Sequence, residues 1–130
     1  MDDIRTAVLA KAVDGNIACA DAHLVAEALG VTPLQVGKVV NKATDLRFNR
    51  CQVGVFGYGP KPEGKHKVVL AAEWVPPEIE AAINERVTDN HISCLDLWTL
   101  AQDFKYPRLA MANIAEAMGL KITPCQLGCF

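Results

Sequence analysis

The chain has 130 residues, 51% of them hydrophobic and 22% charged, a composition that supports a buried core and argues against global disorder. The net charge of -2 excludes a protein that is basic all over, but it allows a local basic surface. No apolar run approaches the roughly 20 residues that a membrane-spanning helix needs, and the acidic start at Asp2 and Asp3 is unlike a secretory signal. We therefore expect a soluble, cytoplasmic protein.

The sequence repeats itself with an offset of 75 residues, which becomes 74 after one deleted residue. The identical pairs include Ile4 and Ile79, Asp14 and Asp89, Cys19 and Cys94, Ala26 and Ala101, Leu34 and Leu109, Cys51 and Cys125, and Gly54 and Gly128. Two copies are too few for a solenoid. The pattern predicts a duplicated small domain, with one copy in residues 1–75 and the other in residues 76–130.

In the first copy, apolar spacing predicts a helix over residues 2–14, a short extended stretch at 17–18 and a second helix over 20–29. Gly30 is a typical helix stop. Thr32 and Gln35 have the spacing of a capping box around Pro33, so a third helix should begin there and run to about residue 44.

Strand-forming residues then fill positions 46–56, a loop rich in glycine and proline covers 57–67, and residues 68–74 again favour a strand. This order predicts a β-hairpin with a long tip. The second copy repeats the helices over 78–88, 93–104 and 108–118, with a strand over 120–130. The chain ends there, so we expect no second hairpin.

This order of elements resembles the winged helix-turn-helix family, and residues 22–36 look like its two-helix core. In that core Ala26 is the small contact residue, Gly30 makes the turn and Val36 is buried. The resemblance implies an α+β fold, mainly helical, with two tandem winged-helix-like three-helix repeats and small β-hairpins, the second repeat lacking a full wing. The second copy departs from the pattern at Lys105, which replaces the turn glycine.

A helix-turn-helix protein reads double-stranded DNA with the exposed face of its third helix and touches the backbone with its wing. The first copy places amide and basic side chains at both positions, and these can contact bases and phosphates. The candidate contacts are Gln35, Lys38, Asn41, Lys42, Arg47 and Arg50 on and after the helix, and Lys61, Lys65 and Lys67 in the wing. We therefore predict a DNA-binding transcriptional regulator or accessory factor.

The second copy suggests a different class of function, a winged-helix module for protein–protein interaction. Its third helix is mostly apolar, and residues 66–130 hold more acidic than basic side chains. The strand over 120–130 has no evident partner within its own copy. An unpaired strand edge invites pairing with the first repeat or another chain, so we expect a homodimer formed through the second repeat. Trp74, Trp98 and Tyr106 are expected in the core or between the copies.

The five cysteines leave a third possibility, a thiol- or metal-responsive sensor. Cys51, Cys125 and Cys129 are the candidate ligands. On an extended strand, residues four apart lie roughly 13 Å from each other, too far to share one ion unless the chain bends at Gly128. The histidines His23, His66 and His91 form no catalytic motif, and no phosphate loop, nucleophile elbow or zinc-protease motif is present. We expect neither catalysis nor a cofactor.

Overall fold

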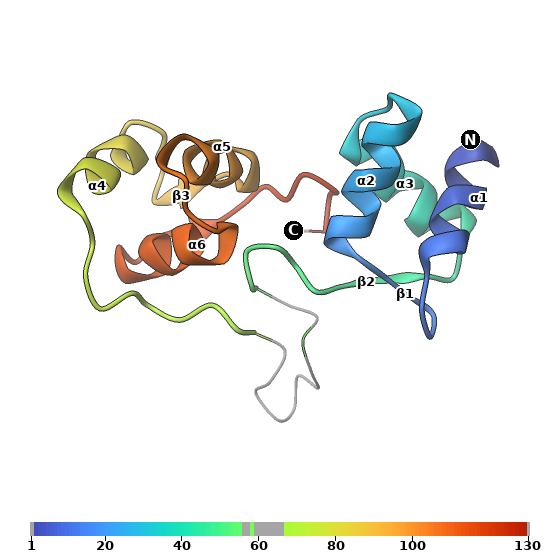
Figure 1. Cartoon of the computed structure of the whole chain (residues 1–130), viewed down its shortest axis with the longest axis horizontal. Coiled ribbons are helices and arrows are strands. Elements are labelled where there is room, and N and C mark those ends of the chain that lie inside the picture. Colours follow the sequence, from blue (N-terminus) through green and yellow to red (C-terminus); the bar gives the residue numbers. More distant parts are fainter. Residues whose placement is uncertain (1, 56–57, 59–66, 130) are drawn as a thin grey trace.

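The computed structural model describes residues 2–55, 58 and 67–129, and within them the chain is mainly helical with short strands, an α+β fold. The first repeat contains α1 (Asp2–Lys11), β1 (Asn16–Ala18), α2 (Cys19–Leu29), α3 (Pro33–Ala43) and β2 (Arg47–Asn49). The second contains α4 (Pro77–Asn84), β3 (His91–Ile92), α5 (Cys94–Phe104), α6 (Arg108–Ala117) and β4 (Lys121–Ile122). Figure 1 shows the two sets of helices as separate lobes joined by extended chain.

Local capping explains why α2 and α3 form where the sequence predicts. The Thr32 side chain accepts a hydrogen bond from the backbone of Gln35, and the Gln35 side chain accepts one from Thr32, so the predicted capping box is confirmed. Gly30 ends α2 with a left-handed φ of 66°. Lys105 adopts nearly the same conformation, with a φ of 58°, at the end of α5. The turn is therefore preserved in the second repeat without glycine.

The strands pair differently from the hairpin that we expected. β1 pairs with β2 in parallel, from Asn16 opposite Arg47 to Ala18 opposite Asn49. β3 pairs with β4 in parallel in the same way, so β4 does have a partner within its own repeat. A parallel pair needs a long crossover between its strands, and here two helices provide it in each repeat.

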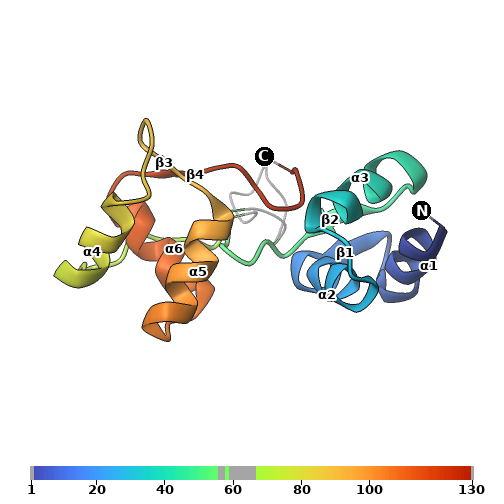
Figure 2. The same ribbon diagram turned by 90° about the horizontal axis from the view of Figure 1, so that it is seen from above.

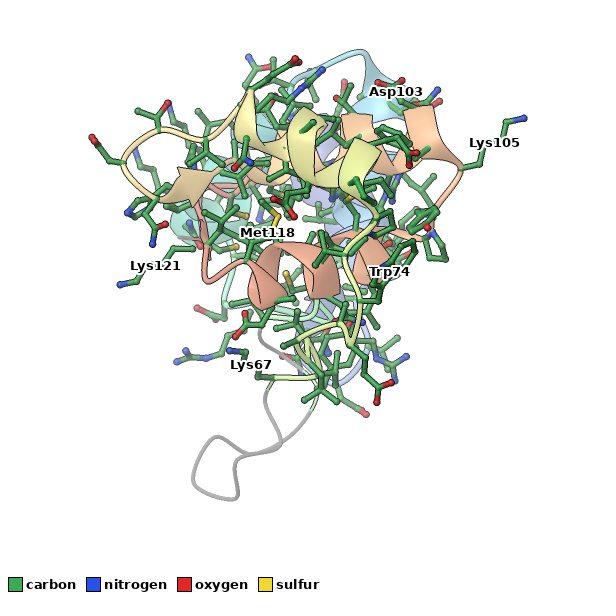
Figure 3. All side chains as sticks on the ribbon, turned by 90° about the vertical axis from the view of Figure 1, so that its left-hand side faces the viewer. Lys67, Trp74, Asp103, Lys105, Met118 and Lys121 are labelled. Atoms are coloured by element: carbon green, nitrogen blue, oxygen red, sulfur yellow. The ribbon has the colours of Figure 1, made fainter. Side chains whose placement is uncertain are left out.

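Residues 68–74, expected to form the returning strand, contain no strand. They instead run along α6, where the backbone N–H of Leu70 donates to the Asn113 side-chain oxygen at 2.9 Å and that of Ala72 donates to the Asn113 carbonyl at 3.0 Å. Figure 3 shows this segment passing α6 from Lys67 to Trp74. The hairpin prediction is wrong here because the segment's backbone groups are satisfied by α6. The tip of the expected wing falls outside the described residues.

Each repeat has its own core, but the two cores exchange residues. Leu127, which follows β4, packs with the buried side chains of α1, α2 and α3 and is only 1% exposed. Cys51, Val53 and Val69, which precede the expected boundary, pack with the buried side chains of α4, α5 and α6. The expected boundary between residues 75 and 76 divides α1–α3 from α4–α6. Each core, however, also contains residues from the other side of this boundary. Figure 2 shows the C-terminal segment crossing from β4 to α3.

Two tight glycine contacts occur where the exchanged segments meet the opposite repeat. A Cβ atom on Gly54 would lie 2.6 Å from the Leu109 side chain, and one on Gly128 would lie 3.0 Å from the Leu34 side chain. Gly54 is equivalent to Gly128, and Leu34 to Leu109. The exchange is therefore reciprocal, with the same glycine contacting the same leucine of the other copy. In α3, a Cβ on Gly37 would lie 1.8 Å from the Leu127 carbonyl oxygen, so only glycine fits there.

Candidate nucleic-acid interface

Helix α3 separates its apolar and polar residues onto opposite sides. Val36, Val39 and Val40 are buried in the core of the first repeat. Gln35, Lys38, Asn41 and Lys42 are all exposed, as predicted for a DNA-contacting face. The helix has no acidic residue, so its exposed side carries two positive charges without an opposing charge on the same element.

The capping box restricts what Gln35 can offer. Its side-chain Oε1 accepts the Thr32 backbone N–H at 2.8 Å. A glutamine that reads adenine uses both its amide oxygen and its amide nitrogen, and here the oxygen is already used. Lys38, Asn41 and Lys42 are therefore the candidate contacts on α3 with free side-chain ends.

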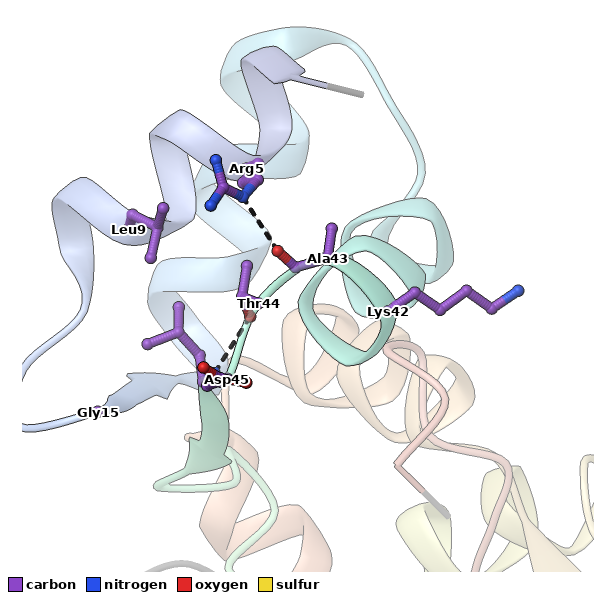
Figure 4. A pocket seen from close by; sticks show the side chains of 8 residues that line it. Arg5, Leu9, Gly15, Lys42, Ala43, Thr44 and Asp45 are labelled. Carbon is purple, nitrogen blue, oxygen red and sulfur yellow. Dashed lines mark hydrogen bonds between the residues drawn. The ribbon is translucent and has the colours of Figure 1, made fainter.

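Arg5 is a basic residue beside α3 that the sequence analysis missed. Its Nε donates to the Ala43 carbonyl at 3.0 Å, which fixes the guanidinium at the C-terminal end of α3. Arg5 and Lys42 line an open cavity of about 450 Å³ together with Asp45. In Figure 4 the two basic side chains lie on opposite sides of the end of α3. The contact spans 38 residues of sequence, so no local pattern could reveal it.

The two arginines that follow α3 have different surroundings. Arg47 lines an open hollow of about 530 Å³ with Asn41, so these two predicted residues are brought together. Arg50 lines another hollow together with Asp14 and Asp21. Both arginines share their hollows with acidic residues, since Asp45 lies beside Arg47, but only the hollow of Arg47 includes a residue of α3.

Of the three predicted wing contacts, Lys67 is the one that the structure describes. Lys61 and Lys65 lie outside the described residues, as does His66. Lys67 lies beside the second repeat, where its Nζ is 3.2 Å from the Glu116 carboxylate and forms an ion pair. Lys67 therefore neutralises a carboxylate of α6 and adds no charge to the face of α3.

The polar residues of α6 are used within the chain. The guanidinium carbon of Arg108 lies 3.5 Å from the ring centroid of Trp98, and its Nη1 donates to the Gln52 side chain at 3.3 Å. Asn113 holds the segment that runs along α6. Trp98 lies between the repeats as expected, but Trp74 is 70% exposed and belongs to neither core.

The cysteines differ sharply in their surroundings. Burial raises the pKa of Cys19 to about 12 and that of Cys94 to about 11, and both thiols stay protonated. The expectation that Cys125 and Cys129 lie on one extended strand is wrong, because β4 ends at Ile122 and the chain turns between the two cysteines at Gly128. Within the described residues no three His, Cys, Asp or Glu side chains are placed to hold a metal ion.

Comparisons of the chain with protein-family models, with curated proteins and with solved structures found no match. None of the helices in the described residues is long and apolar enough to cross a membrane.

Proposed function

We propose that the first repeat binds double-stranded DNA through the exposed side of α3, in the role of a transcriptional regulator or accessory factor. The observation that carries the proposal is the pair Lys38 and Lys42, exposed on a helix without acidic residues and flanked by Arg5 and Arg47. Lysine and arginine side chains clustered on one face are the electrostatic footprint of phosphate contact.

The geometry of α2 and α3 supports this proposal. A left-handed turn at Gly30 joins them, and α3 buries one side against α2 while the other side remains open to a large partner. This is how a helix-turn-helix presents its second helix to the major groove. The proposal uses only this part of the winged-helix resemblance. β1 and β2 pair in parallel and form no hairpin, and the tip of the expected wing lies outside the described residues.

The test is binding of a fluorescent random-sequence duplex, followed by anisotropy across a salt series. The variant Lys38→Glu with Lys42→Glu should weaken binding at least about ten-fold and reduce the salt slope by about 2, because two phosphate contacts are lost. The matched control is Lys105→Glu with Lys121→Glu, which changes the net charge equally. Both of these control lysines are exposed on the second repeat, where Figure 3 shows them pointing outward.

Two results would contradict the proposal. One is an absence of binding even at low salt. The other is equal weakening by both double variants, which would mean that only the total charge matters.

A second candidate, a protein–protein interaction module, is favoured by one specific observation. Leu70 and Trp74 are 73% and 70% exposed on the segment that runs along α6. Large exposed apolar side chains can mark an interaction surface where they belong to one patch, and these two lie on the same segment. If this surface forms a homodimer, in place of the one that we expected through the second repeat, Leu70→Ser with Trp74→Ser should convert a dimer to a monomer in sedimentation, without changing DNA binding.

A further inference from the structure

The C-terminal turn after β4 places two cysteines side by side. The Gly128 N–H donates to the Cys125 carbonyl at 3.2 Å, and Gly128 has a left-handed φ of 84°. This turn reverses the chain and brings the Cys129 thiol close enough to Cys125 for each thiol to shift the pKa of the other. Proximity of this kind, unlike spacing in the sequence, is what disulfide formation requires.

Backbone N–H groups lie near the Cys125 sulfur. The Leu127 N–H donates to Cys125 Sγ at 3.4 Å, and the N–H groups of Gly128 and Cys129 also favour its thiolate. Successive N–H groups that converge in a turn form a nest that favours an anion. The hydrogen bond from the Cys129 thiol, together with these N–H groups, lowers the pKa of Cys125 to about 6 despite its partial burial. The same contact and burial raise the pKa of Cys129, so Cys129 keeps its proton.

The turn is held firmly against the first repeat. Leu127 is buried among α1, α2 and α3, and its carbonyl oxygen lies directly against Gly37. Cys129 is exposed and lines the hollow of about 530 Å³ that also contains Asp45 and Arg47. The pair is therefore preorganised and accessible to a small oxidant.

The first repeat contains the same turn with one difference. The Gly54 N–H donates to the Cys51 carbonyl at 2.9 Å, and Gly54 has a φ of 75°. Val55 occupies the position equivalent to Cys129, so this turn has one cysteine where the other has two. The second thiol distinguishes the C-terminal turn from its internal copy.

We propose that Cys125 and Cys129 are a peroxide-responsive modification site that forms a reversible intramolecular disulfide. The Cys125 thiolate attacks hydrogen peroxide: an S–O bond forms, the O–O bond breaks, and the leaving hydroxide takes a proton to become water. Cys129 then attacks the sulfenic acid on Cys125. The S–S bond forms, the S–O bond breaks, and the released hydroxide takes the Cys129 proton as a second water. Two thiols are oxidised by two electrons, and the peroxide is reduced to two waters. This inference does not depend on DNA binding.

The experiment treats the full chain, fully reduced, with a small excess of hydrogen peroxide at pH 7, blocks remaining thiols, and maps the peptides by mass. We expect the peptide with Cys125 and Cys129 to be lighter by two hydrogen atoms before any other cysteine reacts. Cys129→Val, which copies the first repeat, should stop at a Cys125 sulfenic acid that a cyclic 1,3-diketone traps. Cys129→Ser should give the same result. Because serine is polar and position 129 is exposed, this variant keeps the test valid if the valine variant misfolds.

Three results would overturn the proposal. The first disulfide formed could link a different pair of cysteines or two protein chains. Cys125 could prove no more reactive toward peroxide than Cys51. The Cys129 variants could still lose two hydrogen atoms from this peptide. A thiol reductant should restore the starting mass, and failure to do so would also contradict the proposed reversible disulfide.

Discussion

The ring of His23 lies against the ring of Trp98, with centroids 4.2 Å apart and planes inclined by 44°. The two residues occupy equivalent positions of the two repeats, so the duplicated α2 and α5 meet through the same site on each helix. Arg108 lies against the same indole and reaches Gln52. In the described part of the chain, His23 Nε2 and Trp98 Nε1 are buried without a hydrogen-bond partner.

This contact makes His23 a source of acid sensitivity. Burial, and then the nearby Arg108 guanidinium, lower the pKa of His23 from 6.5 to about 4. The unfolded chain therefore takes up a proton near pH 6.5 that the folded chain accepts only near pH 4. Stability from neutral His23 is complete above about pH 6.5 and is lost as the pH falls to about 4, by up to about 3 kcal/mol.

The variant His23→Phe should keep the ring contact but not titrate. At pH 7 we expect its free energy of unfolding to equal or exceed that of the wild type, since it removes a buried nitrogen without a partner. Between pH 6.5 and 4 the wild type should lose more stability than the variant. Urea denaturation at several pH values measures both curves, and parallel curves would show that His23 does not titrate as described.

Gly37→Ala should destabilise the protein by about 1–3 kcal/mol, although alanine favours a helix over glycine by about 1 kcal/mol. The reason is the Leu127 carbonyl, which occupies the space of the new methyl group. The neighbouring exposed residue supplies a control, because Lys38→Ala should change stability by less than about 0.5 kcal/mol. An unchanged or higher midpoint for Gly37→Ala in urea would mean that the C-terminal turn does not rest on α3.

The exchange of core residues predicts that the repeats unfold together. Leu127→Ala should cost about 2–5 kcal/mol, the usual range for a buried leucine, although the residue lies in the second half of the chain and packs in the first. Its effect should appear equally in probes of either repeat, such as amide signals from α2 and α5. Separate transitions for the two repeats in the wild type would contradict the prediction.

The helices were predictable because their signals are local. The capping box of Thr32 and Gln35 and the stop at Gly30 fix α2 and α3, and the offset of 75 residues transfers the pattern to α5 and α6. The helix ends were less accurate: α1 ends at Lys11, short of the expected residue 14.

The strand pairing and the core exchange were not predictable in the same way, because both depend on contacts between distant residues. Residues 46–56 have the composition of a long strand, but among those that the structure describes only Arg47–Asn49 form one. Cys51 and Val53 then pack in the core of the second repeat. For the candidate site, the sequence identified the exposed residues of α3 but not Arg5, which reaches α3 from α1. The sequence also placed Lys67 among the DNA contacts of the wing, whereas Lys67 forms an ion pair with Glu116. Gly128 was the one residue whose type indicated a bend of the chain between Cys125 and Cys129.

Alkylation by iodoacetamide should single out Cys125 at low pH. Its thiolate, stabilised by the Cys129 thiol and backbone N–H groups, should give a labelling rate that rises with a midpoint near pH 6. At that pH an ordinary thiol has roughly 150-fold less thiolate, but a low-pKa thiolate is also a weaker nucleophile. The net advantage of Cys125 should be about ten-fold over a free thiol such as glutathione.

Two comparisons test whether labelling at low pH is specific to Cys125. Cys19 and Cys94, whose pKa values burial raises to about 12 and about 11, should remain unlabelled in the folded protein at this pH. In Cys129→Val the leading hydrogen bond to the Cys125 sulfur is absent, so the midpoint of Cys125 labelling should move upward while the backbone donors hold it below that of an ordinary thiol. If the midpoint stays near pH 6, the Cys129 thiol does not stabilise the thiolate. If it reaches the value of an unperturbed cysteine, the backbone nest contributes nothing and Cys129 alone accounts for the reactivity of the pair.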